Sequence, residues 1–307
     1  MTRKRLEADL LLAFISFVWG STFVVVKDAL AYASPLVFLL LRFCLALAVL
    51  LAVVGRRAGL RQAGLVRAGI VIGSFLAAGF SFQTIGLQYT TPAKSAFITG
   101  LSVALVPLFL ALFFGRRIRI GSAAGVVMAV VGLYFLTIPP ERFVINRGDL
   151  LTVFCAVCYA GHIIAVGHFA PRFSSAALGI SQIGMAVVCL AVAAPLAYGT
   201  GWQAPMALWH PRLVFAIMVT GVFASALAFT GQAWAQRHTS PTHTAVLFTL
   251  EPVFAGLTSY VVYGEHLAGR ALLGAILILA GILVVELKGP TPTAAEFPVP
   301  PSPEPPG

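Results

Sequence analysis

A carboxylate and a proline stand side by side inside one of the most apolar stretches of the chain. Glu251 and Pro252 lie near the middle of the run HTAVLFTLEPVFAGLTSYVVYGE (residues 243–265). An ionised carboxylate is costly to bury, and a proline leaves the carbonyl four residues earlier without its helical donor. Three roles suit this carboxylate: an ion pair with Arg42, the other charge well inside an apolar run, uptake of a coupling proton, or binding of a cationic group.

Other polar and aromatic side chains in the apolar runs recur at helical spacing, so that each set shares one face of a helix. A polar side chain facing lipid has no partner, and these faces are therefore expected to point toward one interior space. The alternative for each of them is a hydrogen bond within the protein. The candidates for contact with a small molecule are Trp19, Thr22, Gln83, Thr99, Ser102, Tyr159, His162, Phe229, Gln232 and Phe248.

The composition identifies the elements that must position these residues. Of the 307 residues, 59% are hydrophobic and 10% are charged, whereas soluble domains are about 25% charged. The apolar runs match the ~20 residues that cross a bilayer as a helix. We therefore expect a polytopic, all-helical membrane protein. Its ten transmembrane helices are predicted near residues 10–28, 35–54, 65–87, 93–114, 121–138, 149–168, 174–198, 212–236, 242–263 and 270–287.

The chain carries the same five-helix pattern twice. A shift of 140 residues places ADLLLAFISFVWGSTFVVV on GDLLTVFCAVCYAGHIIAV, and a shift of 149 places TTPAKSAF on TSPTHTAV. The halves are residues 1–140 and 141–288, and an odd number of helices in each makes the second half enter the membrane inverted. Inverted repeats are typical of secondary carriers. The proline-rich tail, residues 289–307, is expected to be disordered.

The repeat also matches interruptions within two helices. Pro107 falls opposite Gly256 at the shift of 149, one turn from Pro252. Because an interior proline breaks or kinks a helix, both halves are predicted to contain a hinge at Pro107 and Pro252.

Charges between the apolar runs predict the orientation. The net charge is +10, and most lysines and arginines fall in segments that share a side with the amino terminus, which indicates that both termini are cytoplasmic. The basic residues form short clusters without interleaved aromatics, so nucleic-acid binding is not supported. The CxxC pair, Cys155 and Cys158, lacks further ligands and is interpreted as packing. No metal or cofactor is expected.

Several segments resemble a known family. FVWGSTFVVVKDAL, TTPAKSAFITGLSVALVPLFLALFFGRRI and LEPVFAGLTSYVVYGEHL are similar to EamA-type members of the drug/metabolite transporter superfamily, and the likeness covers about residues 8–287. The resemblance implies a ten-helix carrier of the cytoplasmic (inner) membrane that works by alternating access, often as an exporter of amino acids or other metabolites. Arg116 stands where the family usually has an acidic residue after the glycine, whereas Glu265 keeps the family pattern.

The sequence therefore predicts a multi-pass secondary active transporter that exports a small amphipathic metabolite, such as an amino acid or a related compound. Its expected partners are the substrate, the bilayer and, as one alternative, coupling protons, and it is expected to act as a monomer or a dimer. A facilitative uniporter or channel is one alternative function. An intramembrane enzyme is another, although no GxSxG, HExxH or intramembrane aspartate pair is present.

Overall fold

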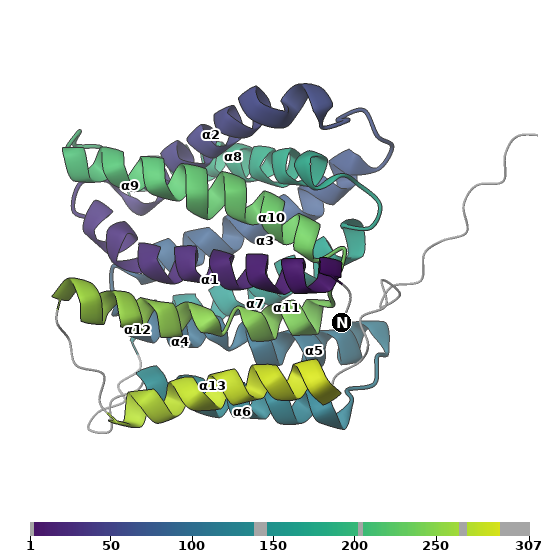
Figure 1. Ribbon diagram of the computed structural model, residues 1–307. Helices are drawn as coiled ribbons and strands as arrows, with labels where there is room; N and C mark the ends of the chain where they lie inside the picture. The colour runs from purple at the N-terminus through teal and green to yellow at the C-terminus, as the bar shows by residue number, and fades with distance from the viewer. Residues whose placement is uncertain (1–2, 138–145, 202–204, 264–268, 289–307) are drawn as a thin grey trace, which may run out of the picture.

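The computed structural model describes residues 3–137, 146–201, 205–263 and 269–288, which form a bundle of helices lying roughly antiparallel to one another (Figure 1). The prediction of a helical membrane fold is confirmed. The helices are α1 (Arg3–Ala29), α2 (Pro35–Val54), η1 (Gly55–Arg57), α3 (Leu65–Gly86), α4 (Pro92–Gly100), α5 (Ser102–Phe114), α6 (Ile120–Thr137), α7 (Arg147–Phe169), α8 (Ser175–Gly199), α9 (Pro211–Gly221), η2 (Val222–Leu227), α10 (Ala228–Ala235), α11 (Pro241–Leu247), α12 (Leu250–Tyr263) and α13 (Gly269–Lys288).

These elements account for the ten predicted membrane-spanning segments. Seven helical segments are long and apolar enough to cross a bilayer, and α6 and α13 contain shorter apolar helices. The pair α11–α12 supplies the remaining segment. Two segments, α4–α5 and α11–α12, are each divided into two helices, and a third contains the π-helical stretch η2 between α9 and α10.

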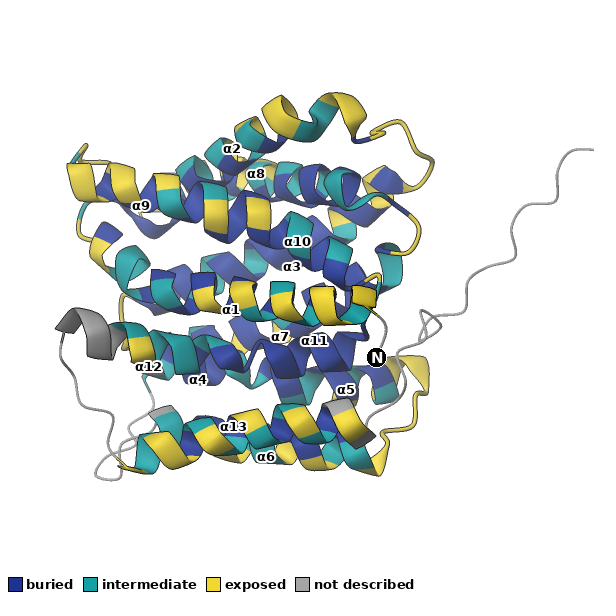
Figure 2. Cartoon of the chain, viewed as in Figure 1, coloured by how far each residue is buried: buried dark blue, intermediate teal, exposed yellow. Residues whose placement is uncertain are grey.

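Exposed residues lie along the outer faces of the helices (Figure 2), and many of them are large and hydrophobic. Large hydrophobic side chains such as Leu112 and Phe113 on α5, and Leu196 on α8, are each more than half exposed. A water-facing surface would not carry so many of them, whereas acyl chains are a suitable neighbour. The exposed apolar faces are therefore the surfaces that contact lipid.

The two halves run in opposite directions, as the odd helix count predicts. α1 begins at the end of the bundle that holds the amino terminus (Figure 1). α7, its counterpart in the second half, begins beside the finish of α3, where the backbone of Gly148 meets the backbone of Gly86. Because α3 runs parallel to α1, α7 begins at the opposite end. We call these the N-terminal end and the far end of the bundle.

The two divided segments are interrupted at matching places in the repeat. The first break lies at Leu101, between α4 and α5, and the second at Phe248 and Thr249, between α11 and α12. A shift of 149 places Leu101 on Leu250, next to the second break. Pro107 itself lies within α5, after the first break, and its role as a hinge stays a prediction. Its missing N–H leaves the Val103 carbonyl, one turn earlier in α5, without a helical donor.

Glycines allow α6 and α13 to pack backbone against backbone. Gly132 faces the carbonyl of Gly274, and Gly125 faces that of Gly281, so that an added Cβ would lie 2.7 and 2.6 Å from these oxygens. The repeat relates Gly125 to Gly274 and Gly132 to Gly281, which makes the contact nearly two-fold symmetric. Small residues at such crossings let membrane helices approach closely. These glycines therefore hold α6 and α13 in close contact.

Replacing Gly132 by Val should force α6 and α13 apart. Overpacking of a tight helix contact costs roughly 1–3 kcal/mol, so thermal unfolding of the purified protein in detergent should shift down by several degrees. Gly199→Ala is the matched control, because no atom lies within 4 Å of the position of its added Cβ. An unchanged midpoint for Gly132→Val would contradict the close packing described here.

Candidate functional site

A cavity lies at the centre of the bundle and extends toward the far end. Its empty volume is about 860 Å³, counting space that opens to its surroundings. The walls come from α1, α2, α3, α4, α7, α10 and α11, with the starts of α5 and α12. Val26 and Leu87, near the ends of α1 and α3, mark its extent toward the far end.

The cavity brings together all ten residues that the sequence singled out for contact with a small molecule, together with Arg42, Glu251 and Pro252. Pro107 is not among the lining residues. The sequence prediction missed Phe23, Phe80 and Thr84, although the helical spacing places each of them within one turn of a predicted residue. The complete lining comprises Trp19, Thr22, Phe23, Val26, Arg42, Phe80, Gln83, Thr84, Leu87, Ala96, Thr99, Gly100, Ser102, Tyr159, His162, Ile163, Phe229, Gln232, Ala245, Phe248, Glu251 and Pro252.

Aromatic rings form one continuous wall of the cavity. The ring of Trp19 lies 4.9 Å from that of Phe248 and 5.4 Å from that of Phe229. Phe80 packs edge-on against Phe229 at 5.8 Å and against Tyr159 at 5.5 Å. Such rings present large, rigid apolar faces. The wall is therefore suited to the apolar part of a ligand.

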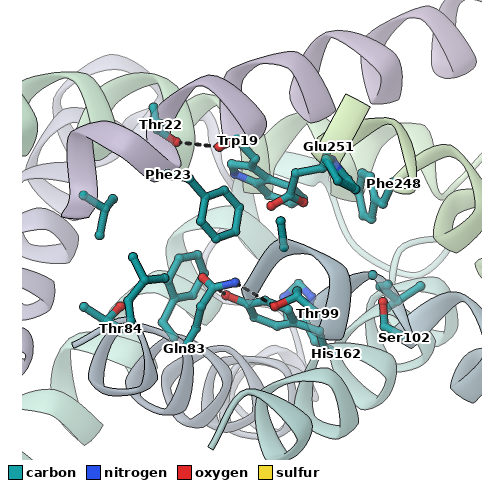
Figure 3. Close-up of a pocket in the computed structure, with 18 of the residues that line it drawn as sticks. Trp19, Thr22, Phe23, Gln83, Thr84, Thr99, Ser102, His162, Phe248 and Glu251 are labelled. Atoms are coloured by element: carbon teal, nitrogen blue, oxygen red, sulfur yellow. Dashed lines mark hydrogen bonds between the residues drawn. The ribbon is translucent and has the colours of Figure 1, made fainter. Parts of the chain in front are cut away.

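A hydrogen-bonded group from three helices lines the cavity across from Trp19. The Gln83 Nε2 donates to the Thr99 hydroxyl at 3.2 Å, and the Tyr159 hydroxyl donates to the Gln83 Oε1 at 3.3 Å. Cys155 lies behind them, with its Sγ 3.8 Å from the Thr99 hydroxyl. Figure 3 shows Gln83 and Thr99 across the cavity from Trp19. Because Thr99 adjoins the first helix break, this group connects the break to α3 and α7.

Two further candidates are engaged within the protein. The His162 Nε2 lies 2.9 Å from the Gln182 Oε1, which gives this histidine the internal hydrogen bond that was the alternative to substrate contact. The Gln232 Nε2 donates to the Gln236 Oε1 at 2.9 Å. The Gln232 Oε1, however, is buried without a hydrogen-bond partner in the described part of the chain. Gln232 therefore retains a free acceptor beside the cavity.

Arg42 is satisfied by the π-helical turn and forms no ion pair with Glu251, which was one of the three roles considered for this carboxylate. The Arg42 Nε donates to the Ser225 hydroxyl at 2.7 Å, its Nη2 donates to the Ala224 carbonyl at 3.1 Å, and its guanidinium lies 4.5 Å from the centre of the Phe80 ring. The Trp19 Nε1 donates to the same carbonyl at 2.9 Å. A π-turn widens the helix and makes carbonyls available to side chains. These neutral acceptors and the aromatic face hold the buried cation in place of a carboxylate.

Glu251 extends into the cavity from the start of α12, next to Trp19 (Figure 3). Its carboxylate has no hydrogen-bond or ion-pair partner among the residues that the structure describes. The second helix break places it there: the backbone N–H of Glu251 bonds the Phe248 carbonyl at 3.0 Å, an acceptor that Pro252 cannot satisfy. Gly20 allows α1 to lie against this backbone, since an added Cβ would clash with the Glu251 carbonyl. The cavity thus contains one negative group that is available to a proton or a cation.

Comparisons with known proteins agree with this architecture. The model of the EamA-like transporter family matches residues 6–138 and 146–287. An uncharacterized transporter of Archaeoglobus fulgidus is 33% identical over 93% of this chain and 87% of its own length. The uncharacterized transporter YyaM of Bacillus subtilis is 24% identical over 91% of this chain and 93% of its own.

Similarity extends to a plant protein and to a solved structure. A WAT1-related chloroplastic protein of Arabidopsis thaliana is 24% identical over 88% of this chain and 67% of its own. One crystal structure superposes with a TM-score of 0.74 at 22% identity, covering 92% of this chain and 97% of the other, and thus shares the fold. The two family matches, one on each five-helix half, and the 33% identical relative lead to one conclusion: the chain is a multi-pass membrane protein that belongs to the EamA-like transporter family.

Proposed function

We propose that the chain is a secondary active transporter that exports a small amphipathic metabolite, an amino acid or a related compound with a cationic group, across the cytoplasmic membrane. The observation that carries this proposal is the unpaired Glu251 carboxylate in a central cavity between two inverted repeats. Carriers of this kind place substrate and coupling ion near the middle of the membrane, at the interface of the repeats and beside broken helices.

The walls of the cavity suit the two parts of such a molecule. Trp19, Phe229 and Phe248 pack on its apolar part, and the Glu251 carboxylate attracts its cationic group. The Gln232 Oε1 and the Ser102 hydroxyl supply hydrogen bonds that orient it. A proton on Glu251 competes with the substrate cation for the same carboxylate, and this competition couples the two movements in opposite directions.

The same geometry supports a carrier more than a channel or an enzyme. A channel uses a filter loop or a ring of charges, whereas the cavity holds one available carboxylate and a group of aromatic rings. An enzyme needs a nucleophile beside a base or a set of metal ligands. Among the described residues, no cluster of three or more histidine, cysteine, aspartate or glutamate side chains could hold a metal, and His162 is engaged by Gln182.

Uptake into proteoliposomes tests the proposed function directly. Purified protein is reconstituted and assayed for flux of amino acids, monoamines and uncharged aromatic compounds, with and without an imposed proton gradient. We expect saturable flux of at least one cationic or zwitterionic compound, and a gradient that drives it. Linear, non-saturating flux would instead support the channel. Folded protein that moves none of the panel would contradict the proposal.

Replacing Glu251 by Gln should remove both the cation site and the proton site. A charged hydrogen bond contributes about 1.5–3 kcal/mol, so we expect flux at low substrate concentration to fall by at least about tenfold. The remaining flux should no longer respond to the proton gradient. Glu7→Gln is the matched control, because the Glu7 carboxylate lies on the outer part of α1 and bonds the exposed Arg3. Full activity of Glu251→Gln would exclude this carboxylate from the mechanism.

Replacing Phe248 by Leu should weaken binding of the apolar part of the substrate. Aromatic contacts contribute roughly 0.5–1.5 kcal/mol beyond their buried area, which corresponds to a rise of about 2- to 10-fold in the half-saturation concentration. Phe113→Leu, at a side chain that is 69% exposed on the outer surface, should leave the kinetics unchanged. Equal effects of the two substitutions would show that Phe248 acts through packing in general.

A further inference from the structure

Two buried ion pairs connect the two halves of the molecule. The Lys94 Nζ donates to the Asp149 Oδ2 at 2.5 Å, with side chains 17% and 4% exposed. The His243 Nε2 lies 2.9 Å from the Asp9 Oδ1, with side chains 5% and 14% exposed. In each pair one residue belongs to the first half and its partner belongs to the second. The pairs therefore join the two repeats directly.

The two pairs occupy the same place in the repeat. A shift of 140 relates Asp9 to Asp149, and a shift of 149 relates Lys94 to His243. The helices that carry the basic residues also begin in the same way. Thr91 caps α4 by accepting the Lys94 N–H, and Ser240 caps α11 by accepting the His243 N–H. Each cap is followed by a proline, which suits the first turn of a helix. The same arrangement, a capped helix start whose basic residue contacts an aspartate of the other half, therefore occurs twice in the chain.

Because the repeats are inverted, the two side-chain pairs lie at opposite ends of the bundle. Lys94 and Asp149 stand at the far end, where α4 and α7 begin, and Asp9 and His243 stand at the N-terminal end, where α1 and α11 begin. A static scaffold has no need of matched pairs at both ends. An alternating-access carrier does, because each end must be held closed while the other opens.

The position of the basic residues links each pair to the cavity. α4 and α11 are short helices, and each ends at a break whose residues line the cavity. Thr99 and Gly100 lie at the inner end of α4, and Phe248 lies at the inner end of α11. A short helix that is held at its outer end and broken at its inner end can tilt without moving the rest of its segment. Contact with a ligand at the break is therefore transmitted to the ion pair.

We propose that these pairs are the two gates of the transporter. Separation of Lys94 from Asp149 tilts α4 and opens the far end, and separation of His243 from Asp9 tilts α11 and opens the N-terminal end. This inference rests on the proposed transport function and assigns four residues to it that lie outside the cavity. They position the moving helices and do not touch the substrate.

The two gates differ in the bonds that accompany the ion pair. Asp149 also accepts the Thr90 hydroxyl at 2.7 Å and the Asn146 N–H at 2.8 Å, and the Lys27 Nζ donates to the Leu87 and Thr90 carbonyls. The repeat equivalent of Thr90 is Thr239, whose hydroxyl has no partner in the described part of the chain. Thr90 therefore supports the far gate through a bond to Asp149, and in the described part of the chain Thr239 forms no such bond at the N-terminal gate.

Sided labelling of a cavity cysteine tests the gates without a substrate. The four native cysteines are replaced, and Ser102, which lines the cavity, is changed to Cys as the single reporter. The protein is reconstituted, and vesicles are sorted by which end faces outward with an amino-terminal tag. A membrane-impermeant thiol reagent is then added outside. The matched substitutions Asp149→Asn and Asp9→Asn each neutralise one gate, and Glu7→Gln is the control.

We expect Asp149→Asn to speed labelling from the far end and Asp9→Asn to speed labelling from the N-terminal end, each by at least about fivefold. Glu7→Gln should change neither rate. Lys94→Met and His243→Met break the same pairs from the other partner, leave the acidic side chains in place, and should reproduce the sided effects if an aspartate variant is poorly folded.

Equal rates from both ends in folded variants would overturn the gates, as would loss of the folded protein in all four, because the pairs would then be static contacts. The outcome is separate from that of the transport assay. If labelling is sided but the protein moves no tested compound, the gate proposal stands and the transport proposal fails. If flux depends on Glu251 but labelling shows no sidedness, the transport proposal stands and the gate proposal fails.

Discussion

Every backbone carbonyl and amide inside a bilayer needs a partner within the protein, and this requirement organises the centre of the molecule. Near the middle of the bundle, the backbone departs from regular α-helix at three places: the two helix breaks and the π-helical stretch η2. At the second helix break, the Thr249 hydroxyl donates to the Val246 carbonyl at 2.6 Å, and the Ser16 hydroxyl lies 3.3 Å from the Leu247 carbonyl. At the π-turn, Trp19 and Arg42 bond the Ala224 carbonyl. Irregular backbone, polar side chains and the cavity therefore occur together.

The repeat explains why the cavity has two kinds of wall. Lining residues come in equivalent pairs, but the members of several pairs differ in chemistry. Thr99 in the first half corresponds to Phe248 in the second, and Ser102 corresponds to Glu251. Inversion brings the two sets to one space from opposite directions. A duplicated scaffold thus supplies the symmetry that two access states need, and substitutions between its halves supply the charge and the aromatic surface that a ligand needs.

Charges inside the molecule fall into two groups with different surroundings. Arg42 and Asp149 each have specific partners, because a buried charge without compensation is strongly unfavourable. Glu251 stands apart, since its carboxylate meets the cavity and has no such partner in the described residues. Its position in the first turn of α12, where helix N–H groups point outward, eases the cost of a negative charge. The one uncompensated carboxylate is also the group that a ligand or proton can reach.

The features that could be predicted from the sequence are those that depend on residues close together in the chain. Composition and apolar run lengths were sufficient for ten spans, because a bilayer demands about 20 apolar residues per helix. The repeat and the helical faces identified residues such as Trp19 and Gln83 as inward-facing, since polar groups avoid lipid. Phe80 and Thr84, one turn from Gln83 or less, were missed for want of a polar contrast with their neighbours.

Partners across helices depend on tertiary packing. Arg42 pairs with Ser225 and the π-turn because α2 lies against that turn, and no spacing within the sequence encodes this contact. The first helix break falls at Leu101, whereas Pro107 lies inside α5. The sequence by itself determined the ten membrane-spanning segments, the two five-helix repeats and the inward faces, since bilayer length, a five-helix period and helical spacing act locally. Only the tertiary structure decided which buried polar groups meet, because residues such as Lys94 and Asp149, 55 positions apart, and Asp9 and His243, 234 positions apart, come together through packing alone.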